Sequence, residues 1–137
     1  METGYIKIIQ EDSKTPLIEA KLINSDLLLT VNEMARLFNC YVMKINSNLR
    51  SIFKSHLLVE KDCSFCNRYS DRGIEKQTIY YNLETLIFLS YRINSFEAKI
   101  FRQFVNTSLR EYLQKKKKPE IKLFWTYLPN KNNYWLN

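Results

Sequence analysis

One short segment of the chain combines amides, a hydroxyl and two cations with regularly spaced apolar residues. The polar members of this segment are Lys44, Asn46, Ser47, Asn48 and Arg50. The apolar residues among them recur at intervals of three and four, which predicts a helix with one polar face. Amides and hydroxyls can hydrogen-bond to base edges, and cations can bind phosphate or guanine. We therefore expect this face to contact DNA, with Asn46 or Asn48 binding adenine.

The surrounding residues, 29 to 53, predict two helices joined by a tight turn. Thr30 can cap the first helix, and Glu33 three residues later can complete a capping box. The turn at residues 39 to 41 lacks the glycine that often occurs between such helices. This arrangement predicts a helix-turn-helix, whereas the alternative is a helical hairpin whose polar face is simply solvated.

A β-hairpin is predicted directly after these helices. Residues 64 to 69 and 75 to 81 form its strands, and the turn signal Ser70-Asp71-Arg72-Gly73 lies between them. A hairpin in this position is typical of a winged helix, and three cations would line it where a wing meets phosphates: Arg68, Arg72 and Lys76. The alternative is an exposed hairpin with solubilising charge.

The remaining predicted elements form a scaffold. Residues 5 to 10 and 17 to 23 alternate as a hairpin, and 26 to 29 predict a further short strand. The candidate buried set of the hairpin is Ile6, Ile8, Ile18, Ala20 and Leu22. Asn82 can cap a buried apolar helix over 83 to 93, and Ser95 can cap a longer helix ending near Leu113. The apolar stripe of that last helix favours a core or dimer contact.

Composition and charge bound the class of protein. The 137 residues predict one folded core, and no apolar run is long enough to span a bilayer. Three cysteines favour a reducing compartment, so we expect a cytoplasmic protein. The net charge of +7 is uneven, because residues 1 to 35 carry −3, residues 36 to 76 carry +4 and residues 113 to 137 carry +5. The predicted helix-turn-helix and hairpin therefore form a local basic region.

The run YYNLETLIFLSYRINSFEAKIFRQFVNTSLREYL, residues 80 to 113, resembles the RhuM family, the virulence RhuM proteins of bacterial islands and mobile elements. The family signature reads approximately YYNLD, an apolar helix ending in GYRV or GYRI, then NS, FRQWA and LREYL. The earlier LTVNEMARLF is similar to the family's LTQEQMAELF element. The resemblance covers about residues 4 to 113 and implies a DNA-binding core without an established reaction.

Some members of that family carry a Fic-type domain, whose chemistry needs an HPFxxGN loop. The one histidine of this chain, His56, lies in KSHLLV without such a loop, so we expect no AMP transfer. The chain departs from the family near Lys115. The domain prediction is therefore a core at 1–113 and a basic, aromatic tail at 114–137.

The tail has three interpretations. Its Lys115–Lys118 run and following aromatic residues can grip phosphates and stack on bases or lie at a membrane surface. The aromatics can instead pack on the core or on a neighbouring subunit. The third interpretation is an altered C-terminus.

Catalytic and metal sites have little support in the sequence. Cys63 and Cys66 have the CxxC spacing of half a zinc site, but extended residues would point the two thiols to opposite faces. We find neither a catalytic triad nor a phosphate-binding glycine loop. The expectation is a chain that is not an enzyme, with no cofactor, no metal and no small-molecule substrate.

The sequence as a whole predicts an α+β winged helix-turn-helix with an N-terminal hairpin and two C-terminal helices. The expected function is sequence-directed binding of double-stranded DNA, for transcriptional regulation of a mobile or accessory element, as a homodimer through the helix at residues 95–113. The rival prediction is a protein–protein interaction module that uses the same fold without contacting DNA.

Overall fold

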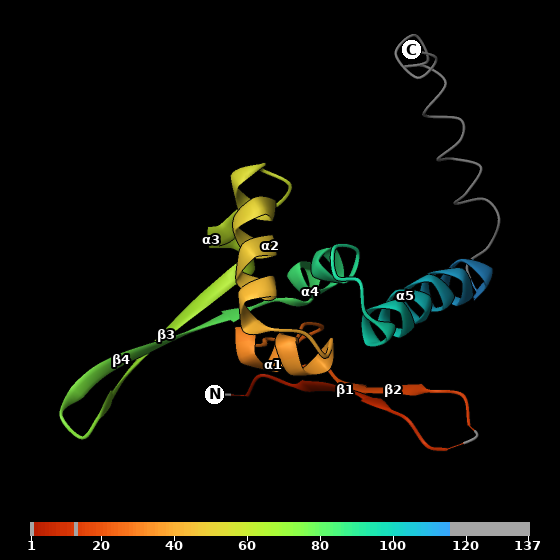
Figure 1. The fold of residues 1–137 in the computed structure, drawn as a ribbon, viewed down its shortest axis with the longest axis horizontal. Helices are drawn as coiled ribbons and strands as arrows, with labels where there is room; N and C mark the ends of the chain where they lie inside the picture. The colour runs from red at the N-terminus through yellow and green to blue at the C-terminus, as the bar shows by residue number, and fades with distance from the viewer. Residues whose placement is uncertain (1, 13, 116–137) are drawn as a thin grey trace, which may run out of the picture. The chain divides into compact units, whose positions relative to one another are not determined.

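The computed structural model describes residues 2–12 and 14–115 and has a mixed α+β fold (Figure 1). Within these residues lie two separate antiparallel hairpins and five helices. Their order is β1 Tyr5–Ile9, β2 Leu17–Lys21, α1 Val31–Leu37, α2 Val42–Lys54, α3 Glu60–Cys63, β3 Ser64–Asp71, β4 Ile74–Tyr81, α4 Leu83–Ser90 and α5 Phe96–Lys115. The predicted α+β class is confirmed.

The chain divides into two units, Met1–Phe104 and Val105–Asn137. The first contains every described element up to the first half of α5. Of the second, the structure describes residues 105–115, which form the C-terminal half of that helix. The predicted interpretations of the Lys115–Lys118 run and the aromatic tail concern residues that lie almost wholly outside the described part of the chain.

The predicted capping box at the start of α1 is present. The backbone N–H of Glu33 donates to Thr30 Oγ1 at 3.2 Å, and the Thr30 N–H donates to Glu33 Oε1 at 2.9 Å. The turn after α1 places Asn39 in the left-handed region, with φ of 52°. Asparagine adopts this conformation more readily than most residues, so it supplies the turn geometry for which glycine is the usual choice.

The helix α2 packs through one side and leaves the other free. Ile45, Leu49 and Ile52 are buried at spacings of four and three, which places them on one face of the helix. The core beside α1 includes an edge-on contact between Phe38 and Phe101, whose ring centroids are 5.7 Å apart. The burial of Ile45, Leu49 and Ile52 fixes the rotation of α2 about its axis and therefore determines which of its side chains face water.

The hairpin of β3 and β4 is closed by a two-residue turn. Asp71 pairs with Ile74, and the residues between them, Arg72 and Gly73, have φ of 53° and 78°. Positive φ at both central residues is the type I′ geometry, whose twist matches the twist of the strands. The hairpin predicted from the sequence is confirmed, and it extends by two residues beyond the predicted first strand.

The predicted strand at residues 26 to 29 does not form as a continuous strand. It is reduced to two isolated bridges, one between Ile23 and Asp26 and one between Leu29 and Tyr81. At the second bridge each residue donates its N–H to the other's carbonyl, at 2.9 and 2.7 Å. This exchange joins the start of α1 to the end of β4, so it anchors the β3–β4 hairpin beside the two helices.

The N-terminal hairpin has the predicted strands, with Ile6 opposite Ala20 and Ile8 opposite Ile18. The predicted burial is wrong for two members of the set, because Ala20 and Leu22 are exposed. A two-stranded sheet covers little apolar surface by itself. Ile6, Ile8 and Ile18 are accordingly only half-buried.

The two C-terminal helices are present with one corrected boundary. Asn82 Oδ1 accepts from Thr85 N–H and Ser95 Oγ accepts from Ala98 N–H, so both predicted caps are confirmed. The first of these helices ends at Ser90 rather than Ile93. The half-buried Arg102 guanidinium donates to the carbonyls of Ser90 and Ile93, which satisfies acceptors that a continuing helix would have used.

The sequence did not predict α3, a single turn whose ends have extended backbone. Among the described residues, no helix is long and apolar enough to cross a membrane.

Candidate nucleic-acid interface

The solvent face of α2 carries a line of exposed side chains. They follow the spacing i, i+4, i+7 and i+11, which stacks them along the side opposite the buried residues. This outer ridge consists of Met43, Ser47, Arg50 and Lys54. Two of the predicted DNA-binding residues, Ser47 and Arg50, therefore face outward together.

The other predicted residues of α2 lie on its flanks. Lys44 is exposed on one flank, and Asn48 beside it is half-buried and donates from Nδ2 to the Lys44 carbonyl at 2.9 Å. Asn46 is half-buried on the opposite flank. The five predicted residues thus do not share one face, and the amide of Asn48 is partly engaged by its own helix.

The charge on α2 has one sign. The helix contains Lys44, Arg50 and Lys54 and has no carboxylate. The described residues form three ion pairs, and all three lie in the hairpins or in the loop between β1 and β2. A solvated helix usually alternates charges at i and i+4, so an unpaired cationic face favours an anionic partner.

A further cation approaches α2 from another part of the chain. The Arg92 guanidinium, two residues after α4, donates to Ser51 Oγ at 2.9 Å. Ser51 lies on α2 between the outer ridge and the Lys44 flank. Sequence reasoning missed Arg92, because no local pattern connects it to residues some forty positions earlier.

The three predicted wing cations do not form one cluster. Arg68 lies opposite Gln77 and Lys76 opposite Tyr69, so Arg68 and Lys76 point to different faces of the hairpin. Lys76 Nζ is 2.9 Å from Asp71 Oδ2 in an exposed ion pair. Arg72 occupies the turn. Arg68 shares its face with Tyr81, the residue that packs on α2.

An aromatic contact joins the hairpin to α2. The rings of Phe53 and Tyr81 are stacked, with centroids 6.1 Å apart and planes 22° apart. Beside them is an open hollow of about 380 Å³, lined in part by Asn46, Arg50 and Glu60. Burial raises the pKa of the Tyr81 phenol, and the nearby Glu60 carboxylate raises it further. The phenol therefore stays neutral at physiological pH.

Two apolar residues at the start of α2 are unusually exposed. Tyr41, the N-cap residue, is 85% exposed, and Met43 is 82% exposed. Within the described residues these are the highest values for any large hydrophobic side chain. The sequence analysis did not select either residue, because it considered only polar side chains as candidates for contact with DNA bases. The signal was present, since Met43 falls outside the apolar phase set by Ile45, Leu49 and Ile52.

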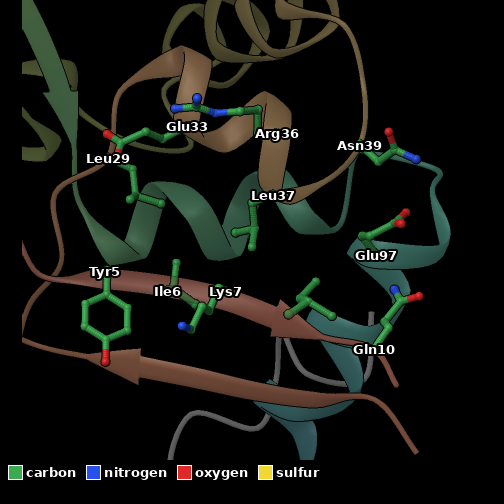
Figure 2. Close-up of a pocket in the computed structure, with 11 residues that line it drawn as sticks. Tyr5, Ile6, Lys7, Gln10, Leu29, Glu33, Arg36, Leu37, Asn39 and Glu97 are labelled. Carbon is green, nitrogen blue, oxygen red and sulfur yellow. The ribbon is translucent and has the colours of Figure 1, made fainter. Parts of the chain in front are cut away.

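A larger open groove of about 610 Å³ lies between β1 and α1 (Figure 2). Leu29 and Leu37 point from above toward β1, while Glu33 and Arg36 lie together higher on its wall. Glu97 of α5 closes the opposite end. The groove mixes apolar and oppositely charged groups. None of its described lining residues is a histidine, cysteine or serine.

Cys63 and Cys66, whose spacing matches half a zinc motif, lie in different environments in the structure. Cys63 is buried with its Sγ 3.8 Å from Glu84 Oε1, whereas Cys66 is exposed on β3 with its Sγ 3.6 Å from Gln77 Oε1. Burial raises the pKa of the Cys63 thiol, which disfavours the thiolate that binds metal. In the described part of the chain, no three His, Cys, Asp or Glu side chains are placed to hold a metal ion.

Comparison of the chain with protein-family models, curated proteins and solved structures finds no match. The resemblance to the RhuM family accordingly stays a prediction from the sequence.

Proposed function

We propose that this chain binds double-stranded DNA in a sequence-directed manner, with α1 and α2 as a helix-turn-helix and the β3–β4 hairpin as its wing. The observation that carries the proposal is the outer ridge of α2, which projects from a helix with three cations and no carboxylate. An α-helix of this kind fits the major groove, where side chains from its exposed face can reach base edges.

The order of the elements supports the same proposal. A helix-turn-helix followed by a hairpin is the layout of a winged helix, and here Leu29 and Tyr81 tie the hairpin to the start of α1. Together with the Phe53–Tyr81 contact, this bridge attaches the base of the hairpin to α1 and α2. A wing so anchored can follow the DNA backbone while the helix occupies the groove.

We propose that the residues of α2 and the hairpin make different kinds of contact with DNA. Arg50, with Lys54 added from the same ridge, would bind phosphate or guanine, and Ser47 would meet a base edge. Lys44 and Asn48 on one flank and Asn46 on the other would contact the groove walls. On the wing we propose Arg68 and Arg72 as phosphate contacts, and Lys76 as a weaker one because of its bond to Asp71.

The biological setting rests on the sequence resemblance alone. If the chain is RhuM-like, its role is regulation of transcription in a mobile or accessory element. We also propose a homodimer through the helix at residues 95–113, where Leu109 and Leu113 are exposed. The same exposed residues are the observation that favours the second candidate function, an interaction module that binds another protein and no DNA.

The test compares charge-neutralised variants of the full chain. Arg50→Gln and Lys54→Gln each remove one proposed phosphate contact. Each should therefore make the negative slope of log affinity against log salt shallower by about 0.9. The matched control is Lys21→Gln, an exposed lysine on the N-terminal hairpin, which should leave the slope unchanged. Equal changes in all three variants would mean that α2 does not dock on DNA.

A second variant separates α2 from the lysine run. Replacing Lys115–Lys118 by glutamine removes four positive charges that could bind phosphates without regard to sequence. The proposal predicts weaker binding to all sequences alike with sequence preference retained. If this variant loses all DNA binding and all sequence preference, the tail and not α2 is responsible for binding.

A further inference from the structure

The start of α2 presents apolar chemistry on an otherwise cationic surface. Tyr41 and Met43 are more than four-fifths exposed, and they precede Arg50 and Lys54 on a helix without acids. Burying apolar surface lowers the free energy of the system, so an exposed methionine on a cationic helix face can add affinity when a partner covers it. Because the adjacent charge is wholly positive, the complementary partner is an anion that also offers apolar groups.

Tyr41 is also an unusual choice for its position. It is the N-cap of α2 and makes no side-chain hydrogen bond to the helix, whereas Thr30 and Asn82 both cap their helices through side-chain oxygens. Ser, Thr, Asp and Asn are the residues that stabilise a helix at this position. Helix capping therefore does not account for the tyrosine at this position.

Double-stranded DNA offers the matching apolar group in one place. The thymine C5-methyl lies in the major groove, and the N-terminal residues of a recognition helix are the ones that reach base edges. Methionine is unbranched and polarizable, so its side chain adapts to such a surface. The amide of Asn48 meanwhile bonds to the Lys44 carbonyl, which leaves less of its capacity for adenine.

We propose that Met43, on the outer ridge of α2, determines specificity by packing on thymine methyl groups in the major groove. The inference rests on the proposed DNA binding and adds the chemical feature that is recognised. The preferred site contains one or two thymines under the first turn of α2. The cations of the outer ridge hold the adjacent backbone.

The test uses deoxyuridine, which pairs like thymidine but lacks the methyl group. The full chain is first used to enrich a duplex from a random pool, and each thymine of that duplex is then replaced singly. We expect an affinity loss of about three- to fourfold at one or two positions, the equivalent of one methyl-sized group left in water. At the remaining thymines the affinity should not change.

Variants assign the effect to a side chain. Met43→Ala should weaken binding to the thymine duplex and should no longer distinguish thymine from deoxyuridine at the sensitive position. The matched control is Leu17→Ala, another exposed apolar residue, placed on the N-terminal hairpin, which should keep the full discrimination. Thermal melting of both variants confirms that each is folded, as expected for exposed sites.

The outcomes are distinguishable from failure of DNA binding itself. A salt-dependent, motif-selective chain that tolerates deoxyuridine at every position would overturn the inference and leave the proposed function standing. Discrimination that persists undiminished in Met43→Ala would also overturn it. If no motif is enriched, the proposed function fails first and the inference fails with it.

Discussion

Replacement of Tyr81 by leucine should weaken the attachment of the hairpin to the helix-turn-helix. The ring is 7% exposed and stacks on Phe53 of α2, while the backbone of Tyr81 pairs with Leu29. The substitution leaves the backbone bridge in place and removes the ring. Its effect therefore measures the side-chain contact separately from the strand pairing.

The magnitude follows from two losses. An aromatic pair contributes about 0.5–1.5 kcal/mol beyond its buried area. The smaller leucine also leaves part of the site unfilled, which costs roughly 1–2 kcal/mol. The free energy of unfolding should therefore fall by about 1.5–3.5 kcal/mol for Tyr81→Leu. For a domain of this size that corresponds to a melting temperature about 6–15 °C lower.

The assay is urea denaturation followed by circular dichroism, with a matched control on the next residue. Tyr80 points to the other face of the hairpin and is only half-buried, so Tyr80→Leu should cost less than about 1 kcal/mol. A double-mutant cycle with Phe53→Leu should give a coupling of about 0.5–1.5 kcal/mol. Equal costs at positions 80 and 81, together with zero coupling to Phe53, would refute the stacking argument.

Two further predictions concern stability. Arg102→Gln should lower the free energy of unfolding by about 1–3 kcal/mol, since the carbonyls of Ser90 and Ile93 lose their donor, and the exposed Lys99→Gln should change it by less than about 0.5 kcal/mol. Denaturation curves of both variants decide this, and equal effects would contradict it. Burial raises the pKa of the Cys63 thiol above its ordinary value of 9.0, so the unfolded chain loses this proton first. Its contribution to stability is complete below about pH 9 and falls as the pH rises further. In reducing buffer, Cys63→Ala should therefore flatten the alkaline loss of stability, and an unchanged pH profile would refute the assignment.

Local chemistry explains what the sequence predicted well. The caps at Thr30, Asn82 and Ser95 each depend on a side chain and a backbone N–H within three residues. The turn at Arg72 and Gly73 likewise depends on conformational preferences of adjacent residues. Such features need no knowledge of tertiary packing, so the starts of α1, α4 and α5 and the hairpin turn were predictable from the sequence.

Features set by distant contacts were not predictable in the same way. The early end of α4 depends on Arg102, twelve residues beyond Ser90, and the reduction of the strand at residues 26 to 29 depends on Tyr81. The exposure of Ala20 reflects a sheet that consists of only two strands within the described part of the chain.

The candidate site likewise combines a feature that could be predicted from the sequence with one that depends on packing. The sequence predicted an interface on α2 with five polar residues on one face, whereas the buried Ile45, Leu49 and Ile52 fix a different outer ridge. That ridge includes Met43, which is missed when only polar side chains are considered as candidates for contact with bases. The rotation of α2 about its axis, more than the identity of its polar residues, determines which side chains form the candidate site.

The most direct measurement of the central claim is selection from a random duplex pool by the full chain in which Lys115–Lys118 are replaced by glutamine. The account predicts that one motif is enriched, that its log affinity falls linearly with log salt, and that Arg50→Gln reduces the slope. Absence of any enriched motif, with residual binding indifferent to Arg50→Gln, would contradict DNA recognition by α2.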